Sequence, residues 1–231
     1  MKKVDLRDFI TFLKNPSSGE YYEINSVSSF LKLVWKSFFV LMGIDIIIGI
    51  LIVIPLRYFN LYPSLNEFKF TPVNILKITI ISPVIEELIF RLPLRISKIN
   101  LAVSFSLIIF LVLKRWCFFN IYLSLSCSSI LFFSLYLYFR KGINIYYKLS
   151  FFLTHHFRQF FYFMALVFGI LHLTNYRVDF RYFYLFPFFA INYLVSGFFW
   201  GYLRVRYTYG IYLCIASHIF VNSIYCFVLS R

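Results

Sequence analysis

Six polar side chains interrupt apolar stretches of this 231-residue sequence and could together carry out chemistry. They are Glu86, Glu87, Arg91, His172, His218 and Asn222. A carboxylate and an imidazole can hold and deprotonate a water molecule, and a second imidazole with an amide can donate hydrogen bonds to the oxyanion that forms when this water attacks a carbonyl. The same side chains could instead hold a divalent metal whose bound water has a lowered pKa. No serine or cysteine has a neighbouring base that would mark it as a nucleophile, so water is the expected attacking group.

Spacing separates the roles of the two carboxylates in SPVIEELIFRLPL. Glu87 and Arg91 share one helix face with the carboxylate on the amino-terminal side, which favours an ion pair. Glu86 points about 100° away in a helix of about 3.6 residues per turn, so it is free to face another helix. Pro83 is expected to loosen the helix before this pair and to release backbone carbonyls.

The composition indicates that these residues lie in a membrane protein. Hydrophobic residues make up 61% of the chain and charged residues only 14%, too little polar surface for a soluble globule. An ionised group near the bilayer centre costs about 2.5 to 3.5 kcal/mol on insertion scales, so each one needs a partner or a function. The net charge of +14 comes from Lys and Arg at the ends of apolar runs, where they meet lipid head groups. Membrane lipids are therefore expected partners, and nucleic acid is not.

Apolar runs predict an all-α fold, a polytopic membrane helical bundle of about seven transmembrane helices. Because the second span runs antiparallel to the fifth and seventh, Glu86 can lie at the same depth as residues late in those spans. The expected spans are Phe30–Pro55, Val73–Ile96, Leu101–Leu113, Phe118–Phe139, Gln159–Leu173, Phe183–Leu203 and Tyr209–Leu229.

The sequence also predicts two domains and the side of the membrane on which the amino terminus lies. Residues 1–28 are expected to form an amino-terminal interfacial helix and linker, and residues 29–231 a membrane domain with its motifs within 82–222. The helix is predicted from an apolar stripe of Leu6, Phe9, Ile10 and Leu13. Lys and Arg are concentrated on the side of the amino terminus, partly in a basic loop predicted from Arg140 to Arg158. The amino terminus is therefore expected in the cytoplasm.

Three ordered motifs resemble those of a known family. EELIFR (Glu86–Arg91), FGILH (Phe168–His172) and HIFVN (His218–Asn222) are similar to the E-E-x-x-x-R, F-x-x-x-H and H-x-x-x-N motifs of the CPBP intramembrane proteases. This family is also called Abi or type II CAAX prenyl endopeptidases. The resemblance runs from about Val73 to Leu229. The chain departs from the family pattern at Leu92, where glycine is usual, and by the hairpin of two spans between the first two motifs.

The resemblance implies a hydrolase, an intramembrane endopeptidase that cleaves a peptide bond of a protein or peptide substrate at the membrane. By this resemblance, Glu86 and His172 activate water, and His218 and Asn222 form the oxyanion site. Glu87 and Arg91 of the first motif would support the helix. The substrate stays open among a prenylated protein, a bacteriocin leader, a signalling peptide and a membrane anchor. The expected location is the prokaryotic plasma (inner) membrane, and the sequence makes no prediction of oligomeric state.

Metal dependence stays open at this point, because the family is described both as glutamate-dependent without metal and as metal-dependent. The favoured expectation is that no cofactor is required, since Asn222 is a weak ligand for zinc but a good donor to an oxyanion. If a divalent metal such as zinc is bound, Glu86, His172 and His218 are the expected ligands.

The alternative is a non-proteolytic membrane protein, such as an immunity or scaffold protein or a small-solute carrier, in which the same polar residues bridge helices. A single histidine is more often packed and hydrogen-bonded than catalytic. Asp45, in the first span, is expected to make a structural hydrogen bond or to pair with a cation. Gly197 and Gly201 form a G-x-x-x-G motif that allows close helix approach. A carrier would be expected to contain paired internal repeats, and the sequence has no convincing repeat.

Overall fold

The computed structural model describes residues 5–19, 21–63, 70–115, 117, 120–141, 144–177 and 180–229. Within these ranges the regular elements are helices, and the bridge between Tyr22 and Tyr207 is an isolated one. The all-α prediction is therefore confirmed. Phe118, the expected start of the fourth span, lies outside the described residues, as do residues 1–4 and 230–231 of the two expected domains.

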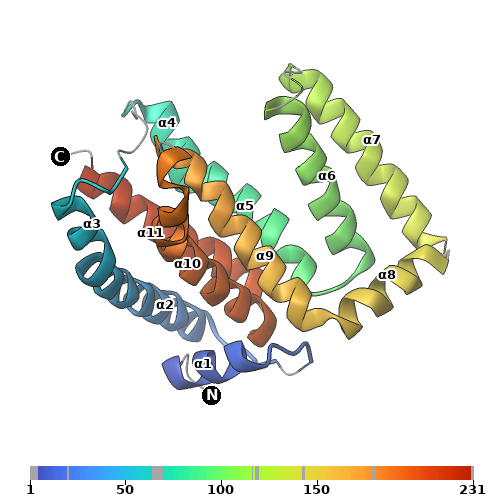
Figure 1. The fold of residues 1–231 in the computed structure, drawn as a ribbon. Coiled ribbons are helices and arrows are strands. Elements are labelled where there is room, and N and C mark those ends of the chain that lie inside the picture. The colour runs from blue at the N-terminus through green and yellow to red at the C-terminus, as the bar shows by residue number, and fades with distance from the viewer. Residues whose placement is uncertain are drawn as a thin grey trace.

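The helices follow the apolar runs of the sequence (Figure 1). A π-helical turn, Gly49–Val53, joins α2 to α3, and a second one, Lys77–Ile81, joins α4 to α5. The elements are α1 (Leu6–Lys14), α2 (Val27–Ile48), α3 (Ile54–Tyr58), α4 (Pro72–Leu76), α5 (Ser82–Phe90), α6 (Lys98–Arg115), α7 (Ile121–Arg140), α8 (Asn144–His155), α9 (Phe157–Leu171), α10 (Phe186–Arg206) and α11 (Gly210–Leu229).

Five helical segments are long and apolar enough to cross a membrane, which indicates an integral membrane protein. The other two expected spans are also helical, as α4–α5 and α6, but they carry charges. Lys77, Glu86 and Glu87 lie within the first of them, so it is not apolar over a full bilayer thickness. The five are Val27–Tyr58, Ile121–Arg140, Phe157–Asn175, Arg181–Arg206 and Gly210–Val228.

Helix α8 corrects the sequence-based prediction of a basic loop from Arg140 to Arg158. Residues Asn144–His155 are helical. Leu153 is buried, and Tyr146 and Leu149 pack against the same apolar cluster. These three side chains follow helical spacing and share one face, which explains why the segment is a helix despite its charges.

The helices form a bundle with a hairpin beside it (Figure 1). In the bundle, α5 runs antiparallel to α9 and α11, while α10 contacts both α9 and α11. The hairpin of α6 and α7 touches the bundle where α6 packs on α5, and α8 leads from the hairpin back to α9. The three motif-bearing segments therefore meet inside the bundle, and of these α5 also contacts the hairpin.

Glycines allow α9 and α10 to pack closely. A Cβ atom on Gly201 would lie 2.7 Å from the Phe161 ring, and one on Gly197 would lie 3.2 Å from the Phe168 ring. Real Cβ atoms do not approach carbon to 2.7 Å without a shift of the neighbour, so a larger residue would push the helices apart. The close approach expected of the G-x-x-x-G motif is confirmed.

Helix α1 packs across the end of the bundle rather than standing apart from it. Phe9 and Phe12 are buried in the bundle's main apolar core, and Tyr202 of α10 donates a hydrogen bond to Asp8 at 2.7 Å. Leu6 and Ile10 remain 47% and 48% exposed. The predicted helix is confirmed, and its apolar residues are divided between the bundle and the outer surface.

Candidate active site

The start of α5 is shaped by Pro83. The preceding turn, Lys77–Ile81, is π-helical, so each N–H bonds to the carbonyl five residues earlier. Pro83 has no N–H and leaves the Ile78 carbonyl without a partner in that ladder. The side-chain amide of Asn222 donates to this carbonyl, with an N···O distance of 3.1 Å. The carbonyl released by the proline is thus the point where α11 is tied to the motif-bearing helix.

Glu87 is fully buried and shared between two partners. Its Oε2 lies 3.4 Å from Nε of Arg91, as the spacing predicts. Its Oε1 lies 2.9 Å from Nδ1 of His218, a contact that the spacing did not reveal. A carboxylate accepts hydrogen bonds, so Nδ1 of His218 carries the proton and Nε2 faces the other way. Glu87 therefore orients one of the two site histidines.

Arg91 joins α5 to its neighbours as well as pairing with Glu87. Its guanidinium carbon lies 3.8 Å from the centre of the Phe168 ring, a cation–π distance. Its Nη1 and Nη2 atoms are buried without a hydrogen-bond partner among the described residues. Arg204 of α10 donates to the carbonyls of Arg91 and Leu92 at 3.1 and 3.2 Å. The carboxyl end of α5 is thereby fixed against α9 and α10.

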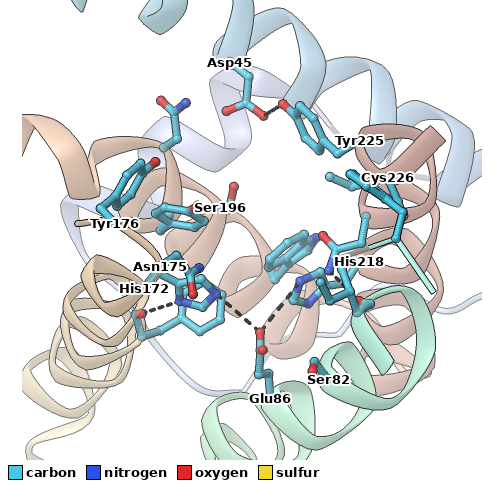
Figure 2. Close-up of a pocket in the computed structure, with 18 residues that line it drawn as sticks. Asp45, Ser82, Glu86, His172, Asn175, Tyr176, Ser196, His218, Tyr225 and Cys226 are labelled. Carbon is cyan, nitrogen blue, oxygen red and sulfur yellow. Dashed lines mark hydrogen bonds and ion pairs between the residues drawn. The ribbon is translucent and has the colours of Figure 1, made fainter. Parts of the chain in front are cut away.

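Glu86 faces the two site histidines (Figure 2). Its Oε2 atom lies 3.6 Å from Nε2 of His172 and 3.8 Å from Nε2 of His218. The same oxygen has no hydrogen-bond partner among the described residues. Its side chain is 26% exposed, whereas that of Glu87 is 0% exposed. The two adjacent carboxylates thus have different environments, as predicted, and only Glu86 is accessible.

His172, at the end of α9, is held in one tautomer. Its Nδ1 lies 2.8 Å from the carbonyl of Phe168. Because a carbonyl can only accept, Nδ1 carries the proton, and in the neutral ring the lone pair on Nε2 points toward Glu86. The ring also stacks on Tyr193, with centroids 4.4 Å apart. One hydrogen bond and one aromatic face therefore position this imidazole.

His218 is positioned in the same way, by Glu87 and by an aromatic ring. Its imidazole stacks on Trp200 with centroids 3.9 Å apart. Trp200 and Tyr193 are two turns apart on α10 and so share one face of that helix. Sequence reasoning missed both residues. Their spacing, beside the G-x-x-x-G motif, was the available signal.

A cavity of about 620 Å³ lies in front of these side chains. Four of the predicted residues line it: Glu86, His172, His218 and Asn222. The supporting pair Glu87 and Arg91 lies behind its wall, with side chains 0% and 1% exposed. The structure therefore places Glu86, His172, His218 and Asn222 around one cavity and separates them from Glu87 and Arg91.

The sequence predicted Glu86, His172 and His218 as the ligands if a metal is bound. The Nε2 atoms of both histidines lie near Oε2 of Glu86, and imidazole nitrogen and carboxylate oxygen are ordinary zinc ligands. In the part of the chain that the structure describes, however, no group of three or more His, Cys, Asp or Glu side chains has an arrangement that could hold a metal ion.

No protein-family model, no curated protein and no solved structure matches this chain. The functional interpretation therefore depends on the geometry of the site. That geometry joins residues of α5, the end of α9 and α11, with α10 supplying the aromatic faces on which both imidazoles stack.

Proposed function

We propose that the protein is an intramembrane endopeptidase of the kind that its motifs resemble, in which Glu86 and His172 activate a water molecule to hydrolyse a peptide bond. One observation carries this proposal. A Glu86 oxygen without a hydrogen-bond partner among the described residues faces two imidazole Nε2 atoms, at 3.6 and 3.8 Å, on the wall of a cavity. These separations exceed direct hydrogen-bond length, so Glu86 is not bonded to either imidazole and remains available to a water molecule that enters between them.

The water would donate one hydrogen to Glu86 and the other to Nε2 of His172, since both atoms accept. Its oxygen attacks the peptide carbonyl carbon while one proton passes to the Glu86 carboxylate. When the C–N bond breaks, this proton moves to the leaving amine nitrogen. Glu86 is then ionised again, and the two products are a carboxylic acid and an amine.

Asn222 and His218 are the proposed donors to the oxyanion. An amide has two N–H donors, and the Ile78 carbonyl occupies one of them, so the second is left for the oxyanion. His218 already donates from Nδ1 to Glu87, so Nε2 can donate only when the ring is protonated. In this mechanism Glu87 acts through His218, and Arg91 holds Glu87 in place.

We further propose that α4–α5 and α6 also cross the bilayer, which gives seven spans. The alternating directions of the helices in Figure 1 support this arrangement. The motif-bearing span tolerates its charges because Glu87, Arg91 and His218 neutralise or bond one another. The concentration of Lys and Arg supports a cytoplasmic amino terminus. The prokaryotic plasma membrane is the location that the motif resemblance implies.

The second candidate is a non-proteolytic membrane protein, and one observation favours it. Asn222 bonds a backbone carbonyl of another helix, and His218 bonds Glu87, so both residues already bridge helices. A scaffold, an immunity protein or a solute carrier would need these bonds for packing alone. A scaffold or an immunity protein would not need Glu86 to face a cavity, whereas a carrier would use such a residue to bind its solute.

The test compares membranes that contain the parent protein with membranes that contain Glu86→Gln, by mass spectrometry of newly formed peptide amino termini. Gln keeps the size of Glu but cannot act as a base, so the expected loss of cleavage is about 10²- to 10⁴-fold. Equal sets of new amino termini in the two membranes would favour the non-proteolytic candidate.

Adding a chelator to the same assay tests whether cleavage requires a metal ion. If Glu86 and His172 activate water without a metal, cleavage persists after exhaustive chelation. Loss of cleavage that added zinc restores would instead assign Glu86, His172 and His218 as ligands.

A further inference from the structure

A second carboxylate faces the same cavity from the side opposite Glu86. Figure 2 places Asp45 of α2 and Tyr225 of α11 across the space from Glu86. The Tyr225 hydroxyl donates to Oδ2 of Asp45 at 2.9 Å, which confirms the structural hydrogen bond expected for this residue. The other oxygen, Oδ1, is buried and has no hydrogen-bond partner in the described chain. One of the two carboxylate oxygens of Asp45 can therefore still accept a hydrogen bond.

A second hydrogen-bond acceptor on the cavity wall also lacks a donor among the described residues. Asn192 of α10 lines the cavity, and its Oδ1 is buried without a partner among the described residues. Buried acceptors without donors are costly, and native proteins keep few of them. Their complement is a group that brings hydrogen-bond donors into the cavity.

The charge of the cavity lining also favours a ligand that donates hydrogen bonds. Among the described residues that line the cavity, two are acidic, Asp45 and Glu86, and none is Lys or Arg, although the chain carries a net charge of +14. A buried carboxylate gains most from a partner that is both cationic and a donor. Lys and Arg side chains have this chemistry, and their aliphatic stems suit a cavity that is otherwise mainly aromatic and aliphatic.

We propose that Asp45, assisted by Asn192, forms a subsite that binds a Lys or Arg side chain of the substrate, so that the enzyme selects peptide segments with a positive charge beside the bond presented to Glu86. This inference rests on the proposed peptidase function for its substrate, but the subsite itself can be tested by binding. Tyr225 is a positioning residue that holds the Asp45 carboxylate toward the cavity.

The first experiment measures binding without cleavage, using Glu86→Gln protein in lipid nanodiscs. The probes are short apolar peptides with blocked termini that carry one lysine, moved through each position in turn, and matched peptides with norleucine in its place. A charge-assisted bond predicts that the lysine peptide binds at least about 10-fold more tightly at one position or a few. Equal affinity for both peptides at every position would overturn the subsite.

Variants then assign the preference to Asp45. Asp45→Asn keeps the acceptor for Tyr225 but loses the charge, so it should no longer distinguish lysine from norleucine. Glu23→Gln, which removes an exposed acidic charge outside the cavity lining, is the matched control and should keep the preference. If Asp45→Asn does not fold, Asn192→Asp serves instead, because a second carboxylate should strengthen the preference for lysine. A lysine preference that neither change at the cavity alters would overturn the assignment.

Cleavage separates this inference from the proposed function. Parent protein incubated with a peptide library should cut where Lys or Arg lies at a fixed distance from the broken bond, and Asp45→Asn should lose this positional preference. Cleavage that depends on Glu86 but has the same positional profile in both proteins would reject the subsite and leave the peptidase standing. Asp45-dependent lysine binding without any Glu86-dependent cleavage would reject the peptidase and leave the cation subsite.

Discussion

Several buried polar groups around the cavity bond between helices, whereas in the α6–α7 hairpin only Ser104, among the described serines with a hydroxyl bond, reaches another helix, by donating to the Ile89 carbonyl of α5 at 2.7 Å. Around the cavity, the bonds join different helices: His218 reaches Glu87 across 131 residues of sequence, and Asn222 reaches Ile78 across 144. In the hairpin, Ser106 and Ser128 donate to carbonyls four residues earlier in their own helices, at 2.7 and 2.8 Å. The cavity helices thus depend on the assembled fold for their polar bonds, whereas Ser106 and Ser128 do not.

Exposure also differs between outward-facing side chains of α7 and the charged pair behind the cavity. Tyr122, Ile130 and Phe133 of α7 are 79%, 67% and 61% exposed, as expected of side chains that face lipid. Arg91 and Glu87 are 1% and 0% exposed. A substitution of a buried charge beside the cavity therefore strands its partner, whereas a substitution at an exposed position of α7 changes only the outer surface. Four substitutions test this difference, in order of falling effect.

Glu87→Gln should have the largest effect on stability. It leaves Arg91 without its counter-charge and weakens the bond that holds His218, and removing one partner of a buried pair costs about 3 to 5 kcal/mol. The free energy of unfolding in mixed micelles measures this loss. A variant as stable as the parent would show that Arg91 does not depend on Glu87 and that the buried network is not what sets the cavity helices apart.

Asn222→Ala should mainly affect rate. Loss of one oxyanion donor is expected to lower kcat by about 10² to 10³, with little change in KM. Because Asn222 also bonds the Ile78 carbonyl, unfolding is measured on the same preparation. Full kcat with reduced stability would make Asn222 a packing residue and remove it from the proposed mechanism.

Gly201→Ala should cost about 1 to 3 kcal/mol through overpacking, because the added Cβ would lie 2.7 Å from the Phe161 ring. Gly43→Ala is the matched control, since a Cβ there meets nothing within 4 Å. The comparison uses the difference between the two unfolding free energies. Equal values would mean that the approach of α9 to α10 is looser than these contacts indicate.

Ser128→Ala in the hairpin should have the smallest effect, within about 0.5 kcal/mol and without change in activity. Its hydroxyl bonds only the carbonyl of Ser124 in its own helix, which loses little when the hydroxyl is removed. A loss similar to that of Gly201→Ala would show that the hairpin is as tightly integrated as the cavity helices, and the contrast would fail.

Sequence spacing predicted the helices and part of the site, because both depend on periodicity within one helix. The pairing of Glu87 with Arg91, the separate direction of Glu86 and the release of a carbonyl by Pro83 all follow from positions on a single helix. The contact between Glu87 and His218 could not be predicted in this way. It depends on how far α11 is rotated about its axis, which is set by packing between helices.

The features that the sequence analysis missed also depend on packing between helices in one case and on periodicity in the other. Trp200 and Tyr193 stack on the site histidines because α10 packs beside them, and an isolated helix does not specify which neighbour its aromatic face meets. Helix α8 is different, since its stripe of Tyr146, Leu149 and Leu153 was present in the sequence. The nearby charges of Arg140–Arg158 concealed a pattern that periodicity alone would have identified.

The docking of α1 has a consequence for how the chain is made. Asp8 bonds Tyr202, which lies 194 residues later in the sequence, and Phe12 packs on Phe161. During synthesis α1 emerges first, yet its binding surface is completed only when α10 has been inserted. Helix α1 therefore cannot dock until α10 has been made, and this long-range contact is expected to form late in folding. A bulky group fused directly before α1 is therefore expected to interfere with this docking.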